Sequence, residues 1–214
     1  MTRRFAWWSI VVSVVVFGLC ALVAVGGGVP GAEQAVFRVI NGLPDALSPG
    51  AEAIQYLGVL AVGPIVAIVA LVFRRPRLAV AALLVTVLKL LMERFVWKIL
   101  QVHRRRPAIT EDVVIIRGDT MTTGLSFVSG HVILVTGLAW VITPFLRGRW
   151  RIAPWIVVAA VGLARIYLGA HNPLDVVGGM ALGTVVGATT FLLLRLDRTD
   201  AASRSAAGRS STEG

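Results

Sequence analysis

Charged residues are scarce in this chain of 214 residues. Asp, Glu, Lys and Arg make up 15% of it, whereas hydrophobic residues make up 57%, and the mean hydropathy is +0.82. A soluble domain of this length needs far less apolar surface to fill its core. The composition therefore excludes an ordinary soluble domain and indicates a protein that lies mostly in lipid.

Cysteine and the common cofactor motifs are scarce as well. The single cysteine, Cys20, forms no internal disulfide, so it gives no information on the redox compartment. We interpret it as a buried thiol in a membrane helix. The chain has no glycine-rich nucleotide loop, no Cys/His cluster with zinc spacing and no internal repeat. It also lacks a carboxylate cluster suited to magnesium, so we expect neither a metal nor another cofactor.

Long apolar runs, in contrast, fill the chain. An α-helix needs about 20 apolar residues to cross the hydrocarbon layer. Six runs are candidates, and they lie at residues 5–25, 53–73, 78–100, 131–146, 152–168 and 174–194. A signal peptide is the alternative for the first run, although that run exceeds the roughly 7 to 15 residues of a signal core. We expect an all-α fold, a six-helix membrane bundle over residues 1–196 without a separate soluble domain.

Basic residues predict how the bundle lies in the membrane. The net charge of +10 raises the alternative of a nucleic-acid partner, but the Lys and Arg residues are not spread over the chain. One group of arginines precedes the first run, lies between the second and third and between the fourth and fifth, and follows the sixth, so all of it falls on one side of the membrane. These residues are Arg3, Arg4, Arg74, Arg75, Arg77, Arg147, Arg149, Arg151, Arg195, Arg198, Arg204 and Arg209. The positive-inside rule makes that side cytoplasmic, with both termini inside. Segments 26–49, 101–130 and 169–173 then face outward, and we expect no nucleic-acid partner.

The segments outside the apolar runs differ in charge and composition. The second external segment carries Arg104, Arg105, Arg106 and Arg117, which indicates either an anionic ligand or a solvated basic loop. Residues 31–44 form either a short interfacial helix or an ordered loop. Residues 197–214 are rich in Ser, Ala, Gly and Arg from position 199 onward, and we expect a disordered cytoplasmic tail. The sequence does not indicate an oligomeric state.

Three polar islands lie at the external ends of the runs, where ionisable residues are costly and are usually kept for function. They are KILQVHRRRP at 98–107, SFVSGH at 126–131 and ARIYLGAHNPLD at 164–175. Each alone has an ordinary explanation: an interfacial arginine at Arg165, a helix end at Arg106, or a helix cap at the other two. Their occurrence together, with one of the three histidines of the chain in each, favours a functional site.

The residue types of the islands suit phosphoryl transfer. Arginine binds phosphate oxygens with two parallel hydrogen bonds, and a helix that begins at Ser129 and Gly130 directs free backbone amides at an anion. Two histidines, His131 and His171, supply an acid for the leaving oxygen and a nucleophile. Asp175, four residues after His171, can orient the imidazole and hold the Nδ1 proton, which leaves Nε2 free to attack.

These residues resemble the type 2 phosphatidic acid phosphatase superfamily, whose signature reads KxxxxxxRP, PSGH and SRxxxxxHxxxD. The resemblance covers residues 98–175, and with the six-helix layout most of the chain. It implies a fold of membrane helices and a metal-independent lipid phosphatase with a phosphohistidine intermediate. It assigns His171 as nucleophile, Asp175 as its partner and His131 as general acid. The residues that it assigns to phosphate binding are Arg106, Arg165, Ser129, Gly130 and Lys98.

The sequence departs from that signature at three positions. Val128 replaces the proline before SGH, and Ala164 replaces the serine before Arg165. Lys98 stands eight residues before Arg106 instead of seven, and one residue on a helix is a rotation of about 100°. A haloperoxidase-like enzyme, a non-catalytic lipid-phosphate-binding protein and a structural membrane subunit are the alternatives. The resemblance predicts a multi-pass cell-membrane enzyme with an extracytoplasmic site, acting on a polyprenyl diphosphate or monophosphate, phosphatidic acid or phosphatidylglycerol phosphate.

Overall fold

The computed structural model describes residues 1–197, and the regular structure in that part of the chain is helical, which confirms the all-α prediction. The α-helices are α1 (Arg3–Val25), α2 (Gly31–Asn41), α3 (Ser48–Gln55), α4 (Val62–Val72), α5 (Pro76–Lys98), α6 (Pro107–Thr110), α7 (Gly130–Ile142), α8 (Ala153–Tyr167) and α9 (Pro173–Leu193). Short 3-10 helices are η1 (Asp45–Leu47), η2 (Tyr56–Gly58), η3 (Thr143–Phe145) and η4 (Gly148–Ile152). The predicted disordered tail at 199–214 lies outside the described residues.

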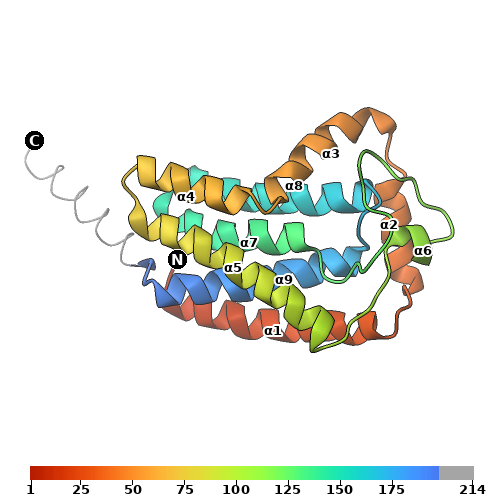
Figure 1. Ribbon diagram of the computed structural model, residues 1–214, viewed down its shortest axis with the longest axis horizontal. Helices are drawn as coiled ribbons and strands as arrows, with labels where there is room; N and C mark the ends of the chain where they lie inside the picture. The colour runs from red at the N-terminus through yellow and green to blue at the C-terminus, as the bar shows by residue number, and fades with distance from the viewer. Residues whose placement is uncertain (198–214) are drawn as a thin grey trace, which may run out of the picture.

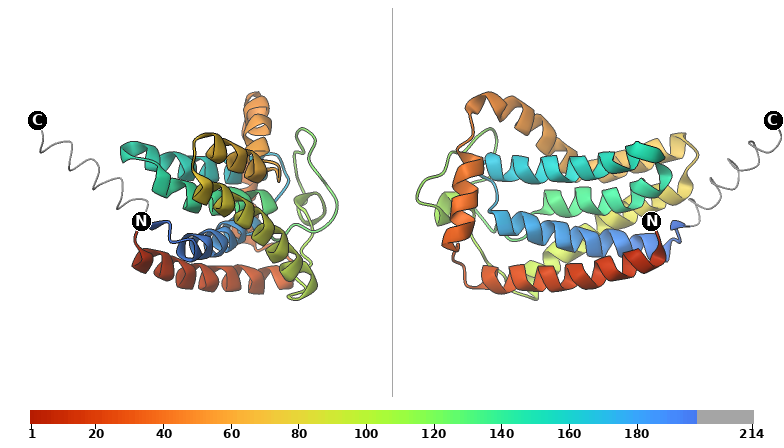
Figure 2. Two further views of the ribbon diagram at one scale, coloured as in Figure 1. Left: turned by 60° about the vertical axis from the view of Figure 1, so that its left-hand side comes forward. Right: turned by 180° about the vertical axis from the view of Figure 1, so that it is seen from behind.

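The long helices run side by side, so the connecting segments gather at two ends of an elongated bundle (Figures 1 and 2). One end holds the start of α1, the α4–α5 turn, the α7–α8 turn and the end of α9. The opposite end holds α2, α6, the long segment between α6 and α7, and the turn from α8 to α9. The three segments that the charge pattern groups together as external thus lie at the same end.

Several helices have the length and composition of membrane spans. Three qualify within the described residues: α1, the continuous stretch Gly148–Tyr167, and α9; the pair α3–α4 makes a fourth if it is one bent span. The helix at Gly130–Phe145 is apolar but shorter. Helix α5 has 23 residues, but it carries five charged side chains, Arg77, Lys89, Glu93, Arg94 and Lys98. The structure thus has several membrane-capable helices, while a count of six remains a prediction.

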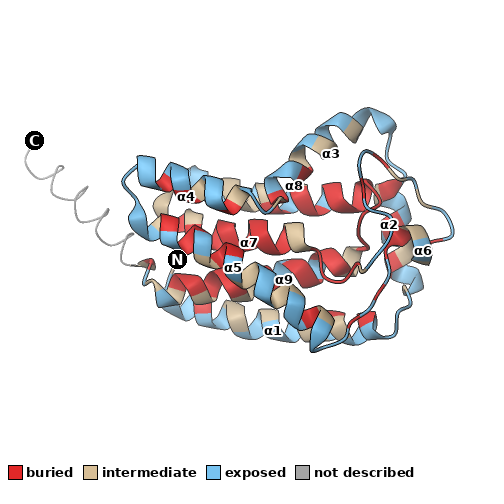
Figure 3. Ribbon diagram, in the orientation of Figure 1, coloured by how far each residue is buried: buried red, intermediate tan, exposed pale blue. Residues whose placement is uncertain are grey.

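Helices α7 and α9 form the centre of the bundle, and α1 lies on its outside (Figure 3). In the most apolar 18-residue window of α9, 61% of the residues are buried, whereas in that of α1 only 17% are buried. Helix α1 exposes a long row of valines and leucines. Lipid tails can cover such an apolar surface, whereas its exposure to water would be unfavourable. Helices α7 and α9 approach closely because Gly183 and Gly187 face α7, where a Cβ at Gly187 would lie 2.5 Å from Trp140 Cβ.

The prediction of one continuous helix at 53–73 is wrong. Helix α3 ends at Gln55, a 3-10 turn follows, and α4 begins at Val62, with a bend of 69° between the two parts. Pro64 lies in the first turn of α4, where the missing N–H has no intrahelical acceptor in any case. The bend brings Gly58 against His131: a Cβ at Gly58 would lie 2.7 Å from His131 Cβ. The break therefore places this segment beside the candidate site.

Candidate functional site

Backbone hydrogen bonds and one arginine join the three polar islands at the end of the bundle that holds α2 and α6. The Ser129 amide donates to the Asp175 carbonyl at 3.1 Å, which holds the second island on the third. Arg106 Nη1 donates to the Ala170 carbonyl at 2.9 Å, and Arg106 Nε donates to the Thr123 carbonyl at 2.9 Å. The islands that were separate in sequence are thus one cluster in the structure.

His171 lies in the short turn between α8 and α9, with Asp175 in the first turn of α9. Its Nδ1 is 3.8 Å from Asp175 Oδ2, too far for a direct hydrogen bond. Ser126 lies between them: its Oγ is 3.4 Å from His171 Nδ1, and it donates a short hydrogen bond to Asp175 Oδ2. If Nδ1 carries the proton and donates it to Ser126, Nε2 keeps its lone pair. Ser126 belongs to the second island, but the sequence motifs assign it no role.

Burial sets the protonation state of His171. Loss of solvent lowers the pKa of His171 to about 4; the nearby Asp175 opposes this shift, whereas Arg165 and Arg106 act in the same direction as burial. The imidazole is therefore neutral at physiological pH, which a nucleophile requires. Burial also lowers the pKa of Arg106, which remains a cation because its ordinary pKa is so high.

Arg165 is the second arginine of the cluster, near the end of α8. Its side chain is buried, and Nη1 donates a short hydrogen bond to Gln55 Oε1 at the end of α3. Its Nε has no hydrogen-bond partner among the described residues. A buried donor without a partner costs free energy, so the guanidinium retains a strong capacity to bind an anion.

The first turn of α7 completes the cluster. Ser129 precedes the helix, and its buried Oγ has no hydrogen-bond partner within residues 1–197. The first N–H groups of any α-helix lack intrahelical acceptors and carry a partial positive charge. His131, the second residue of α7, lies near His171 and near the cations Arg165, Lys89 and Arg106, whose charges act on it. Donors and cations thus converge on the space around the two histidines.

Helix α5 adds a lysine that the sequence did not single out. Lys89 Nζ pairs with Glu93 Oε2 at 2.7 Å, and both side chains are largely buried. They lie beside Gly130, where a Cβ would overlap Glu93 Oε1 and come within 3.1 Å of Lys89 Cε. Lys98, which the motif suggested, lies at the exposed end of α5, and its side chain makes no hydrogen bond or ion pair with other described residues. Lys89 therefore lies beside the start of α7, whereas Lys98 lies at the exposed end of α5.

The basic segment at 101–130 is neither a solvated loop nor wholly free for a ligand. Arg104 is fully buried and pairs with Glu33 and Asp175, and Arg106 binds two carbonyls. Arg117 pairs with Asp45 at 2.8 Å, donates to three backbone carbonyls, and lies 4.2 Å above the Tyr167 ring. Of the four arginines, Arg105 alone is exposed. Most of this charge therefore holds the segment on the bundle.

The cluster combines two histidines, a carboxylate and two arginines around the start of a helix. Cations at that place suit an anion, and a neutral imidazole opposite a second histidine suits group transfer to nitrogen. No three His, Cys, Asp or Glu side chains of residues 1–197 lie close enough together to hold a metal ion. The arrangement defines a site for a phosphate-like group at one end of a membrane helix bundle.

Comparison with known proteins identifies the family. The model of the PAP2 superfamily matches residues 77–198, which is more than half of the chain and includes all three islands. The chain belongs to the PAP2 superfamily. The resemblance noted from the sequence motifs is thereby confirmed.

Three known proteins illustrate what the chain is similar to. A 64-residue stretch is 39% identical to the lipid A 4′-phosphatase of Porphyromonas gingivalis, a match that covers 28% of this chain and only 26% of that relative. The crystal structure of LpxE from Aquifex aeolicus matches with a TM-score of 0.62 and 27% identity, over 73% of this chain and 93% of that one. The transmembrane PAP2-type phosphatidylglycerolphosphate phosphatase of Bacillus subtilis shares the fold, with a TM-score of 0.64 and 22% identity over 86% and 94% of the two chains.

Proposed function

We propose that this protein is an integral membrane phosphatase that hydrolyses a phosphomonoester or pyrophosphate of a membrane lipid through a phosphohistidine. The single observation that carries this proposal is the buried cluster of His171, Ser126 and Asp175 beside His131. Mere binding of an anion needs neither a nucleophile nor an acid. Membership of the PAP2 superfamily and the similarity to a lipid A 4′-phosphatase support a lipid phosphatase.

The reaction proceeds in two displacements at phosphorus. His171 Nε2 attacks, the N–P bond forms, and the bond from phosphorus to the lipid-side oxygen breaks while His131 gives that oxygen a proton. Water then attacks the phosphohistidine, His131 accepts a proton from it, and the N–P bond breaks to release phosphate. Arg106 and Arg165, with Ser129 Oγ and the amides of Gly130 and His131, bind the phosphate oxygens as negative charge redistributes. No step requires a metal, so we expect activity in the presence of chelator.

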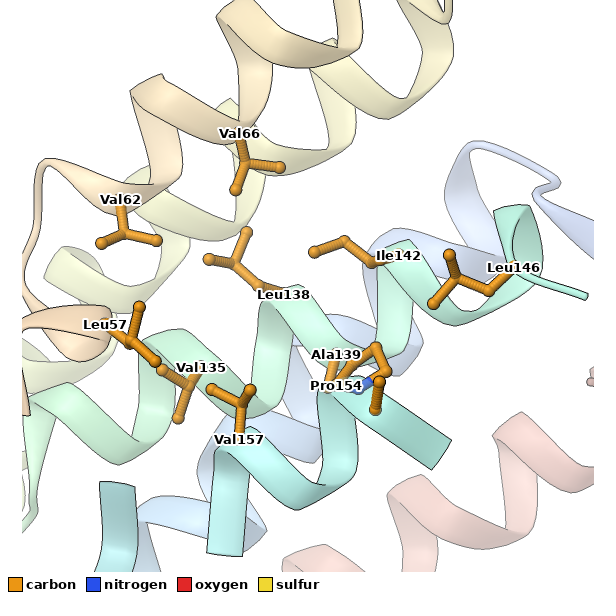
Figure 4. Close-up of a pocket in the computed structure, with 11 residues that line it drawn as sticks. Leu57, Val62, Val66, Val135, Leu138, Ala139, Ile142, Leu146, Pro154 and Val157 are labelled. Carbon is orange, nitrogen blue, oxygen red and sulfur yellow. The ribbon is translucent and has the colours of Figure 1, made fainter. Parts of the chain in front are cut away.

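A lipid chain has a suitable place beside the cluster. An apolar pocket of about 280 Å³ lies between α4, α7 and α8, and its side chains point into it from all three helices (Figure 4). Leu57 and Val135 line it near the site, since Leu57 precedes Gly58 and Val135 lies one helical turn beyond His131. A phosphate can then remain among the arginines while its chain lies in an apolar groove. This arrangement favours a lipid substrate over a soluble phosphate ester.

The same reasoning gives the proposed setting of the enzyme. The six runs would cross the cell membrane with both termini in the cytoplasm, because the arginine-rich α4–α5 and α7–α8 turns lie at the same end as the start of α1 and the end of α9. The site would then lie at the extracytoplasmic face. Residues 1–196 would form the phosphatase domain.

Phosphate release by the purified protein in detergent with EDTA tests the function. We expect release from at least one of a polyprenyl diphosphate, a polyprenyl monophosphate, phosphatidic acid, phosphatidylglycerol phosphate and a lipid A phosphate, the last added because of the relatives. Rates measured side by side would identify the substrate. Activity that disappears with EDTA and returns with a divalent cation would contradict the metal-free mechanism. Well-folded protein that releases nothing from all five would favour a non-catalytic member of the family.

The choice between two lysines gives a second prediction. We expect Lys89→Met to lower kcat/KM by about 10- to 100-fold, because it removes a cation beside Gly130 and leaves the Glu93 carboxylate unpaired near the phosphate. Lys98→Met is the matched variant on the same helix and should have the smaller effect. Initial rates over a range of lipid phosphate concentrations measure both. A larger loss for Lys98→Met would show that the motif lysine reaches the site after all.

A further inference from the structure

A fully buried arginine joins helix α2 to the candidate catalytic aspartate. Arg104 Nη2 and Nη1 lie 2.5 and 3.0 Å from the two carboxylate oxygens of Glu33, in the parallel geometry of a strong ion pair. Arg104 Nη1 is also 3.4 Å from Asp175 Oδ1. One cation therefore lies between two buried carboxylates that are 142 positions apart in the sequence.

Glu33 also fixes the start of α9. Its Oε1 accepts a hydrogen bond from the Leu174 amide at 2.8 Å, one residue before Asp175. The Asp175 carboxylate itself accepts from the Asn172 amide at 2.9 Å and from Ser126 Oγ. A carboxylate at this place is stabilised by the free amides of the first helical turn. Helix α2 thus holds the helix end that carries Asp175.

The charges around Asp175 come from several elements. Arg104 and Arg106 act on it from the segment after α5, and Glu33 acts on it from α2. His171, which is neutral, lies in the preceding turn. Loss of Arg104 would leave two buried carboxylates without their shared cation, which is costly in a space with little solvent.

We propose that Glu33, Arg104 and Ser126 are positioning residues, which hold the Asp175 carboxylate aimed through Ser126 at His171, so that α2 contributes to the site. This inference rests on the proposed phosphatase function. Ser126 transmits the position of the carboxylate to Nδ1, and Arg104 holds its second oxygen, Oδ1. Glu33 takes most of the hydrogen bonding of Arg104, so that the arginine does not draw Asp175 away from Ser126.

Charge-cancelling variants of the full-length protein test the proposal. We expect Arg104→Gln to lower kcat by about 100-fold with little change in KM, because two buried carboxylates then lose their shared cation and Asp175 no longer stays on Ser126. The double variant Glu33→Gln with Arg104→Gln removes both charges. It should recover part of kcat.

Neighbouring residues supply the controls. Arg105→Gln makes the same charge change at the adjacent, exposed position, and we expect kcat and KM to equal those of the wild type. If Arg104→Gln fails to fold, Ser126→Ala is the milder variant, and we expect it to lower kcat about 10-fold or more with little change in KM.

The outcomes separate this proposal from the function on which it rests. If the wild type is active and Arg104→Gln has the same kcat, or if the double variant is slower than the single one, the positioning role is overturned and the phosphatase function stands. If Arg104→Gln changes only the unfolding temperature and not kcat, Arg104 is merely structural. A wild type without phosphatase activity contradicts the proposed function first, and the positioning role with it.

Discussion

His171→Ala should abolish phosphate release, by at least about 1,000-fold in kcat, because the variant has no atom that can form the proposed covalent intermediate. His171 is buried beside Ser126 and Asp175, and its pKa of about 4 keeps Nε2 unprotonated throughout the physiological range. Rapid-quench labelling with a 32P-labelled lipid phosphate should trap a phosphoenzyme on the wild type and none on the variant.

The third histidine of the chain is the matched control. His103 lies next to Arg104 in the segment between α5 and α6 but is exposed, so His103→Ala should keep wild-type labelling and turnover. Membrane insertion and the unfolding temperature in detergent should be alike for both variants. His171→Ala that still hydrolyses lipid phosphate would show that His171 is not the nucleophile, and a label that persists on the variant would direct the search to another residue.

The helices could be predicted from the sequence because lipid imposes a simple requirement on length and polarity. The boundaries of α1, α5, α8 and α9 differ from the predicted runs by only a few residues. The prediction of a continuous helix at 53–73 failed for a physical reason that hydropathy does not reveal. Leu57, Val59 and Leu60 around the break are as apolar as a continuous helix would be, while the bend itself depends on Gly58 and its contact with His131.

The histidines and Asp175 could be found because helix ends and motif spacing fix where they lie. The residues that support them could not. Arg104, Arg105 and Arg106 are adjacent and identical in type, yet the structure buries the first with Glu33, exposes the second and places the third beside His171. Only the fold of the segment separates their roles.

Long-range partners are equally hidden in a single sequence. Glu33 is an acidic residue in a short amphipathic segment, with no local sign that it lies on Arg104. Gln55, a polar residue at the edge of a predicted span, gave a weak signal, since such residues are usually kept for a reason. Lys89 and Glu93 gave the stronger one, as an oppositely charged pair four residues apart inside an apolar run.

Arg165→Lys should lower kcat/KM by about 100-fold or more, although it keeps the positive charge. The guanidinium presents several donors in a plane, and the structure uses one of them, Nη1, on Gln55 while the buried Nε remains without a partner among the described residues. A lysine ammonium would have to choose between Gln55 and the phosphate, and it cannot bind two phosphate oxygens in parallel. Steady-state rates with the best lipid phosphate should show the loss in both kcat and KM, because the arginine holds the phosphate before and during transfer.

Arg105→Lys makes the same exchange at the exposed arginine and should leave both constants unchanged. Gln55→Leu completes the comparison. It removes the partner of Arg165 but keeps the guanidinium, so it should be less damaging than Arg165→Lys if the essential interaction is with phosphate. If Gln55→Leu is the worse of the two, the interaction with α3 matters more than the contact with phosphate. Full activity in Arg165→Lys would mean that Arg165 serves only to place a charge at the end of α8, as an interfacial arginine does in many membrane helices.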